Sequence, residues 1–189
     1  MIETKKIIQA VCYILQQIGR SDKLKLVKLL YLADKCHLMR YGRTITGDEY
    51  WAMDYGPVGS TTKDILTFDE RFLSHEYKYA AKMLNKVNDY DFEAAEKCGP
   101  RNLDLLSDTD IEAMEFIIKY FGSKNKNELI KYTHRYPEWS QFKQLFEHGK
   151  SKREKIQTED LLSTIPGDPF NMPIEHLEES RRILTGISE

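Results

Sequence analysis

Apolar residues recur at three- and four-residue steps over the first forty positions of the chain. In residues 4–18 they fall on one face, opposite lysine and glutamine, which is typical of a helix with one buried face. In residues 22–42 they cover most of the circumference, and Lys25, Lys28 and Lys35 form a narrow polar line. A helix of this second kind must be surrounded by other elements, so we expect it at the centre of the fold with the lysines as its solvated strip.

Suitable capping residues mark the ends of these two helices. Gly19 can end the first helix in the left-handed conformation. Ser21 or Asp22 can begin the second helix by accepting a hydrogen bond from the free amides of its first turn, and Gly42 can end it.

Residues 44–55 change to a period of two, with turn chemistry at Gly47-Asp48. This pattern predicts a short antiparallel hairpin. Pro57 cannot donate a hydrogen bond to a strand, but it suits the first turn of a helix. We therefore expect a helix over residues 57–68.

Helical patterns dominate the rest of the chain. The segment 92–107 interrupts them with the turn signal Cys98-Gly99-Pro100, which fits either a second hairpin or a loop. A capping residue at Ser107 or Asp108 marks one helix start. The expected helices cover residues 75–87, 107–121, 125–134 and 137–147, with two short ones within residues 158–189.

Together these elements predict a mainly α fold, a compact helical domain around a central apolar helix with a small antiparallel β-hairpin. The charged, glycine-containing stretch HGKSKREK is typical of a linker. We therefore predict a domain over residues 1–149 and a C-terminal helical extension over residues 150–189.

Composition sets the class of protein. The 189 residues are 41% apolar, enough for a globular domain with a proper core, and the formal net charge of -2 does not favour nucleic acid or a lipid surface. No apolar run approaches the length of a membrane span, and the N-terminus is too interrupted by polar residues to be a secretion signal. We expect a cytoplasmic protein without a membrane partner.

The three cysteines give no sign of a disulfide framework or a zinc site. Cys12, Cys36 and Cys98 are odd in number, far apart, and outside any C-x-x-C pair. We expect reduced thiols and no metal.

No common signature of hydrolysis, nucleotide binding or metal-dependent catalysis occurs in the chain. His37 lies beside Cys36, but adjacent helical residues point about 100° apart and cannot hold one metal, so packing is the better interpretation. His134 ends a predicted helix, where a charged imidazole is favoured and can cap free carbonyls. We expect no enzyme, no catalytic residue and no cofactor; an enzyme interpretation would start from His134.

Nucleic-acid binding is an alternative for the second helix. Its lysines could contact phosphates if the first two helices formed a helix-turn-helix, but arginine or asparagine placed to read base edges is missing there. A DNA-binding regulator predicts salt-dependent binding that is lost on Lys25→Glu plus Lys28→Glu. The lysines in question are Lys23, Lys25, Lys28 and Lys35.

Four motifs follow one another along the chain, and their order helps to identify a family: KLVKLLYLADKCHL, GDEYWAMDYGPV, LLSDTDIEAMEFIIKYFG and NELIKYTHRYPEW. Over residues 5–145 they resemble the Panacea domain of the SocA-like antitoxin family. The chain departs from the family at Phe121, where a tyrosine is usual, and at Arg135, where an acidic residue is usual. The matching residues are Lys25, Lys28, Leu29, Leu30, Tyr31, Ala33, Trp51, Tyr55, Gly56, Pro57, Val58, Leu106, Ser107, Thr133, His134 and Trp139.

The resemblance implies an antitoxin, a cytoplasmic protein that neutralises a co-encoded toxin by direct binding. Some family members are thought to deliver the toxin to an ATP-dependent protease instead. The alternative is a DNA-binding autoregulator of a mobile-element operon. We interpret the motif residues as structural: Tyr55-Gly56-Pro57 would turn the chain from hairpin to helix, with Trp51 and Tyr55 packed on the central helix.

The partner contacts are expected in the C-terminal extension, at Phe170, Ile174 and Leu177. This region lies outside the shared motifs, and residues 151–189 hold five lysines and arginines against eight acids, a net charge of -3 that would suit a basic toxin. The alternative is that the extension packs on its own domain.

Overall fold

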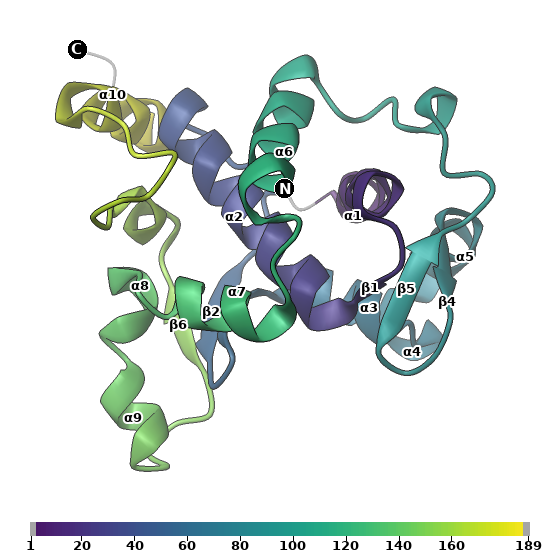
Figure 1. The fold of residues 1–189 in the computed structure, drawn as a ribbon, viewed down its shortest axis with the longest axis horizontal. Helices are drawn as coiled ribbons and strands as arrows, with labels where there is room; N and C mark the ends of the chain where they lie inside the picture. Colours follow the sequence, from purple (N-terminus) through teal and green to yellow (C-terminus); the bar gives the residue numbers. More distant parts are fainter. Residues whose placement is uncertain (1–2, 187–189) are drawn as a thin grey trace.

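The computed structural model describes residues 3–186 as a mainly α fold with two small antiparallel sheets (Figure 1). Short 3-10 helices η1 (Ser74–Glu76), η2 (Pro100–Asn102) and η3 (Thr158–Leu162) connect longer elements. The strands are β1 (Ser21–Asp22), β2 (Tyr50–Met53), β3 (Gly56–Gly59), β4 (Leu84–Lys86), β5 (Asp91–Ala94) and β6 (Glu154–Ile156). The α-helices are α1 (Thr4–Ile18), α2 (Lys23–Tyr41), α3 (Ser60–Thr67), α4 (Glu70–Leu73), α5 (Tyr77–Met83), α6 (Asp108–Phe121), α7 (Lys126–Thr133), α8 (Pro137–Ser140), α9 (Lys143–Glu147) and α10 (Ile174–Thr185).

Helix α2 runs through the middle of the molecule, and α1, α6, α7 and α10 all pack against it (Figure 1). Every residue from Leu26 to Met39 is buried. The predicted caps are present: the Asp22 side chain accepts a hydrogen bond from the Leu24 amide at 2.8 Å, and Gly42 is left-handed. Asn125 and Ser107 cap α7 and α6 in the same way, each with a capping box.

The hairpin is displaced from its predicted position. Strands β2 and β3 pair around Asp54 and Tyr55, with Met53 opposite Gly56, so Gly47-Asp48 is not the turn of the hairpin. Pro57 lies in β3, an edge strand, where its missing amide costs no sheet hydrogen bond. Helix α3 starts at Ser60 instead, because the Asp48 carboxylate accepts hydrogen bonds from the amides of its first turn.

The second sheet has the order β1-β5-β4. It shortens the helix predicted over residues 75–87, which ends at Met83 because residues 84–86 form β4 and pair with β5. Only the start of the segment 92–107 belongs to this sheet, and Cys98-Gly99-Pro100 leads into η2, so the loop is present and the hairpin expected as its alternative is not. Nearby, Cys12 of α1 and Cys98 form a disulfide, while Cys36 is free and buried. The expectation of three reduced thiols is wrong, because the fold brings together two cysteines that lie 86 positions apart in the sequence.

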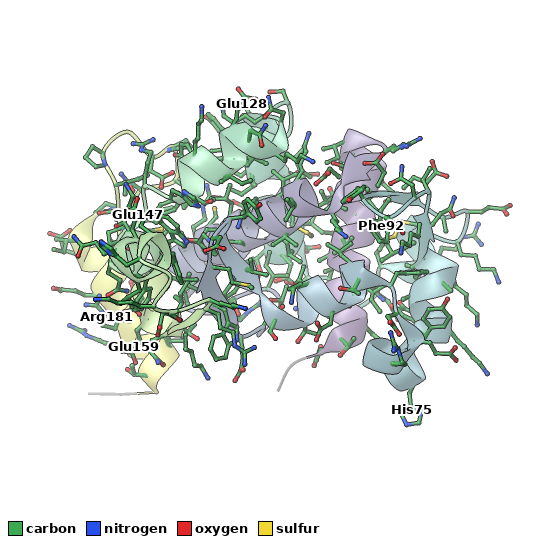
Figure 2. All side chains as sticks on the ribbon, turned by 90° about the horizontal axis from the view of Figure 1, so that it is seen from below. His75, Phe92, Glu128, Glu147, Glu159 and Arg181 are labelled. Carbon is green, nitrogen blue, oxygen red and sulfur yellow. A yellow bond between two sulfur atoms is a disulfide. The ribbon has the colours of Figure 1, made fainter. Side chains whose placement is uncertain are left out.

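The C-terminal region packs onto the rest of the chain. Strand β6 pairs with β2, and α10 lies across the end of α2, where the Ser180 hydroxyl donates to the Met39 carbonyl at 2.9 Å. Exposed charged residues such as Glu147, Glu159 and Arg181 lie on the outside of the molecule, whereas Phe92 is buried (Figure 2). No helix within residues 3–186 has both the length and the apolar character required to cross a membrane.

Candidate functional site

Helix α2 carries four polar side chains in its buried stretch: Lys28, Asp34, Lys35 and His37, each with no exposed surface. The prediction that Lys28 and Lys35 lie on a solvated strip is therefore wrong. A buried charge without a partner is very unfavourable, so each of these groups requires polar partners from the surrounding elements. Many of those partners come from the segments that carry the other sequence motifs.

Lys28 lies at the junction of two motifs. Its Nζ donates to the Pro57 carbonyl at 2.6 Å. Gly56 has a φ of +96°, and a Cβ atom added there would lie 2.9 Å from Lys28 Nζ and 2.9 Å from Thr133 Oγ1. Burial lowers the pKa of Lys28 to about 7. The hairpin and the end of α7 thus enclose the lysine so closely that only glycine fits at position 56.

His134 and Trp139 pack together beside this junction. Their rings stack at 3.5 Å between centroids and 4° between planes, and Trp139 Nε1 donates to the Met53 carbonyl at 2.7 Å. Burial, followed by the neighbouring charges of Lys28 and Lys143, lowers the pKa of His134 to about 4. The imidazole is therefore neutral near pH 7, and the charged helix-capping role predicted for it is wrong.

A second lysine, Lys35, lies two turns further along the same face of α2 and forms a buried ion pair. Lys35 Nζ lies 2.7 Å from Glu138 Oε1, and neither side chain has exposed surface. The ammonium also donates to the carbonyls of Leu161 and Ser163, each at 2.8 Å. Tyr31 of α2 donates its hydroxyl to the same glutamate at 2.6 Å. Burial lowers the pKa of Lys35, although the Glu138 carboxylate acts in the opposite direction.

These contacts connect α2, the hairpin, α7 and α8. The comparison with known protein families gives a match over the same part of the chain. The family model described as "Antitoxin SocA-like, Panacea domain" matches residues 26–140, which is more than half of the chain. The chain belongs to this family. No match to a curated protein or to a solved structure was found.

The matched part of this Panacea domain contains both lysine junctions except for the carbonyls of Leu161 and Ser163. Lys28, Gly56, Pro57 and His134 meet within it, although more than one hundred positions separate the first from the last. The motif residues predicted to be structural in the α2, Gly-Pro and Thr-His segments are therefore brought together. The domain boundary at residues 149 and 150 stays a prediction.

Asp34 fixes the segment that leads into the hairpin of the Panacea domain. It accepts hydrogen bonds from the Tyr50 hydroxyl at 2.6 Å and from the amides of Ile45 and Thr46 at 2.8 and 3.1 Å. Burial raises its pKa to about 6 despite these hydrogen bonds. The residues predicted to form the first strand are thus held as a loop around one carboxylate.

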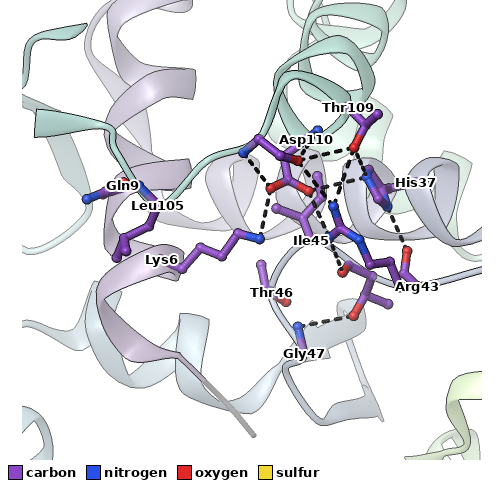
Figure 3. A network of polar contacts seen from close by, with 12 residues as sticks. Lys6, Gln9, His37, Arg43, Ile45, Thr46, Gly47, Leu105, Thr109 and Asp110 are labelled. Atoms are coloured by element: carbon purple, nitrogen blue, oxygen red, sulfur yellow. Dashed lines mark hydrogen bonds and ion pairs between the residues drawn. The ribbon is translucent and has the colours of Figure 1, made fainter. Parts of the chain in front are cut away.

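Asp110 joins α6 to α1 and α2 (Figure 3). It lies 2.8 Å from Lys6 Nζ, 3.0 Å from Arg43 Nη1 and 3.2 Å from His37 Nε2. Burial favours its neutral form, but the hydrogen bonds from Lys6 and Ser107 outweigh this, so its pKa lies below the ordinary value. The packing role predicted for His37 is confirmed, since its other ring nitrogen lies 2.7 Å from the Arg43 carbonyl oxygen.

The DNA-binding geometry predicted for the α2 lysines is wrong. Lys28 and Lys35 are buried, and Lys25 Nζ donates to the Gly122 carbonyl at 2.6 Å. Lys23 and Lys25 are both partly exposed, and the Lys23 ammonium donates to the Asp89 carbonyl. These four side chains therefore cannot form a row of phosphate contacts.

The aromatic residues of the hairpin are arranged differently from the prediction. Side chains alternate along a strand, so Tyr50 points inward, with its ring 5.5 Å from that of Tyr31, while Trp51 points outward. Arg153 covers the Trp51 ring at 4.7 Å. Tyr55 is 62% exposed at the turn, so the expectation that it packs on α2 is wrong.

The three predicted partner contacts do not share one surface. Phe170 is 1% exposed, and its ring lies 6.4 Å from that of Phe121, so a partner does not reach it in this fold. Leu177 is half-buried, and Ile174 is 68% exposed. The interpretation of Ile174 and Leu177 as partner contacts stays a prediction, while Phe170 belongs to the core.

No group of three or more histidine, cysteine or acidic side chains within the described residues is placed to hold a metal ion. Lys28, Asp34 and Lys35 are instead matched to other protein groups, whereas the buried Nε2 of His134 has no hydrogen-bond partner within the described residues. The sequence did not predict that Asp34, Lys35 and Glu138 are buried polar groups. The one signal that could have indicated this is a charged residue within a mainly apolar stretch.

Stability is expected to rise with pH above neutrality because of Lys28. Its pKa in the fold is about 7, below the ordinary value of 10.5. Between these values the unfolded chain binds a proton that the folded chain does not, so the free energy of unfolding increases with pH. We expect the free energy of unfolding of the wild type, measured with urea at several pH values, to rise by up to about 1.4 kcal/mol more per pH unit than that of Lys28→Met. Equal slopes in both proteins would contradict this assignment.

Proposed function

We propose that this protein is an antitoxin that neutralises a co-encoded toxin by direct protein–protein binding. The observation that carries the proposal is the family match over residues 26–140, which supports an antitoxin role. The protein acts by covering toxin surface, without making or breaking covalent bonds, and does so in the cytoplasm. A specific interface of this kind buries on the order of 1,200 Å² or more.

The internal chemistry of the fold is consistent with such a scaffold. Lys28 and Lys35, the two most unusual cations, are both engaged with backbone carbonyls inside the protein. Groups already matched in this way hold elements together and are not available to a substrate. We therefore assign the partner-binding role to the outer surface.

Rescue of growth tests the proposal. The protein encoded next to this one is expressed until growth arrests, with and without co-expression of this chain. We expect co-expression to restore growth and the two proteins to co-purify; a frameshifted copy of the gene is the control that translation is required. Failure of rescue together with absence of a complex would contradict the proposal.

The same experiment distinguishes masking from proteolysis. If the toxin is only covered, its level stays constant while growth recovers. A toxin level that falls during recovery, and that is maintained when ATP-dependent proteases are deleted, would add delivery to a protease as a second step after binding.

A further inference from the structure

A mainly apolar groove of about 420 Å³ opens beside the tip of the hairpin. It lies between the β2–β3 turn, the first turns of α2 and the end of α3. Its volume falls in the range of about 300–1,000 Å³ that is usual for binding pockets. Among the apolar residues that line it are Leu24, Val27, Val58 and Leu66.

Lysines border this groove. Lys23, Lys63 and Lys152 line it, against a single acid, Asp54. Lys63 and Lys152 are exposed and take part in no ion pair within residues 3–186. The border is therefore positively charged and free to pair with acids of a partner.

One exposed tyrosine lines the groove, and a second lies next to the lining residue Lys23. Tyr55, which lines it, is 62% exposed, and Tyr90 is 63% exposed with its ring 5.1 Å from Lys23 Nζ. Tyrosine is enriched among the residues that dominate interface energies, because it has a large rigid apolar ring and a hydroxyl. Met53 also lines the groove, on the same outward face of β2 as Trp51, which extends the surface along the hairpin.

The exposed apolar residues of α10 do not form a comparable surface. Ile174 and Ile183 are 68% and 57% exposed, but nine positions along a helix place two side chains on opposite sides. Apolar residues scattered singly over a surface are normal and mark no site. The groove, in contrast, combines an apolar floor, unpaired charge and an exposed tyrosine in its lining.

We infer that this groove is the docking site for the toxin, and that it receives an apolar side chain from an acidic segment of that protein. The inference rests on the proposed antitoxin function and names the surface that performs it. Apolar floor residues would contact the inserted side chain, while Lys63 and Lys152 would pair with flanking aspartate or glutamate. This partner chemistry is opposite to the basic toxin expected from the charge of the C-terminal region, because the charges nearest to the groove are lysines.

Binding of the purified adjacent gene product, measured by calorimetry, tests the inference. For Lys63→Glu plus Lys152→Glu we expect Kd to rise at least about tenfold at low salt, with a smaller effect at high salt. Tyr55→Ala is expected to raise Kd by about tenfold at any salt concentration. The matched control, Lys97→Glu plus Lys131→Glu, reverses two exposed lysines outside the groove and is expected to leave Kd unchanged.

The outcomes separate the inference from the proposed function. If the wild type binds the toxin and the groove variants bind equally well, the docking site is elsewhere and the antitoxin proposal stands. Loss of binding in Ile174→Asp alone would place the contact on α10. A wild-type chain that neither binds nor rescues overturns both.

Circular dichroism melting checks that each variant is folded. If the charge-reversed variant unfolds, Lys63→Gln plus Lys152→Gln removes the same charges without introducing acids, and we still expect a rise in Kd of about fivefold. Unchanged Kd in this folded variant and in Tyr55→Ala would overturn the inference.

Discussion

Replacing Glu138 by alanine is expected to lower the free energy of unfolding by about 3–5 kcal/mol. Glu138 and Lys35 have no exposed surface, so the substitution leaves a buried ammonium without its counter-charge. It also removes the acceptor of the Tyr31 hydroxyl, which lies 2.6 Å from the carboxylate. Because small domains are stable by only about 5–15 kcal/mol, a lower yield of soluble protein is expected as well.

Urea unfolding monitored by circular dichroism measures this loss. The matched control is Glu147→Ala, which removes an acid whose ion pair with Lys143, at 3.5 Å, is exposed. Such surface pairs contribute about 0–1 kcal/mol. Lys35→Met combined with Glu138→Leu removes both charges and is expected to recover part of the loss. A cost of Glu138→Ala no greater than that of the control would show that water reaches the pair.

Gly56→Ala is expected to cost about 2–3 kcal/mol. The φ of +96° is unfavourable for any residue with a Cβ atom, and that atom would lie 2.9 Å from Lys28 Nζ and 3.2 Å from His134 Cδ2. Both neighbours belong to the packed junction between α2, the hairpin and α7. Neither can move away without loss of the Pro57 hydrogen bond or the Trp139 stack.

Gly167→Ala provides the matched control for backbone strain alone. Gly167 has a φ of +74°, and nothing lies within 4 Å of an added Cβ atom. Its replacement is expected to cost about 1–2 kcal/mol from left-handed strain. Equal losses at the two positions, measured by urea unfolding, would mean that the contacts around Gly56 add nothing.

Local signals in the sequence predicted the parts of the fold that depend on neighbouring residues. The periodicity of α1 and the caps at Asp22, Gly42 and Ser107 are confirmed because each involves atoms a few positions apart. The hairpin was predicted to exist but with the wrong turn. Its position depends on Asp34, which holds residues 45 and 46 as a loop across a distance of eleven or twelve positions.

By itself, the sequence determined the mainly α class, the ends of the principal helices and the family, since these follow from spacing, capping and local motif residues. Only the tertiary structure decided that Lys28 and Lys35 are buried and that Tyr55 is exposed. The position of a lysine in a helical pattern is the same whether its ammonium donates hydrogen bonds to water or to a buried carbonyl. The carbonyls and the carboxylate of Glu138 come from segments 29 to 128 positions away, and no local pattern encodes such contacts.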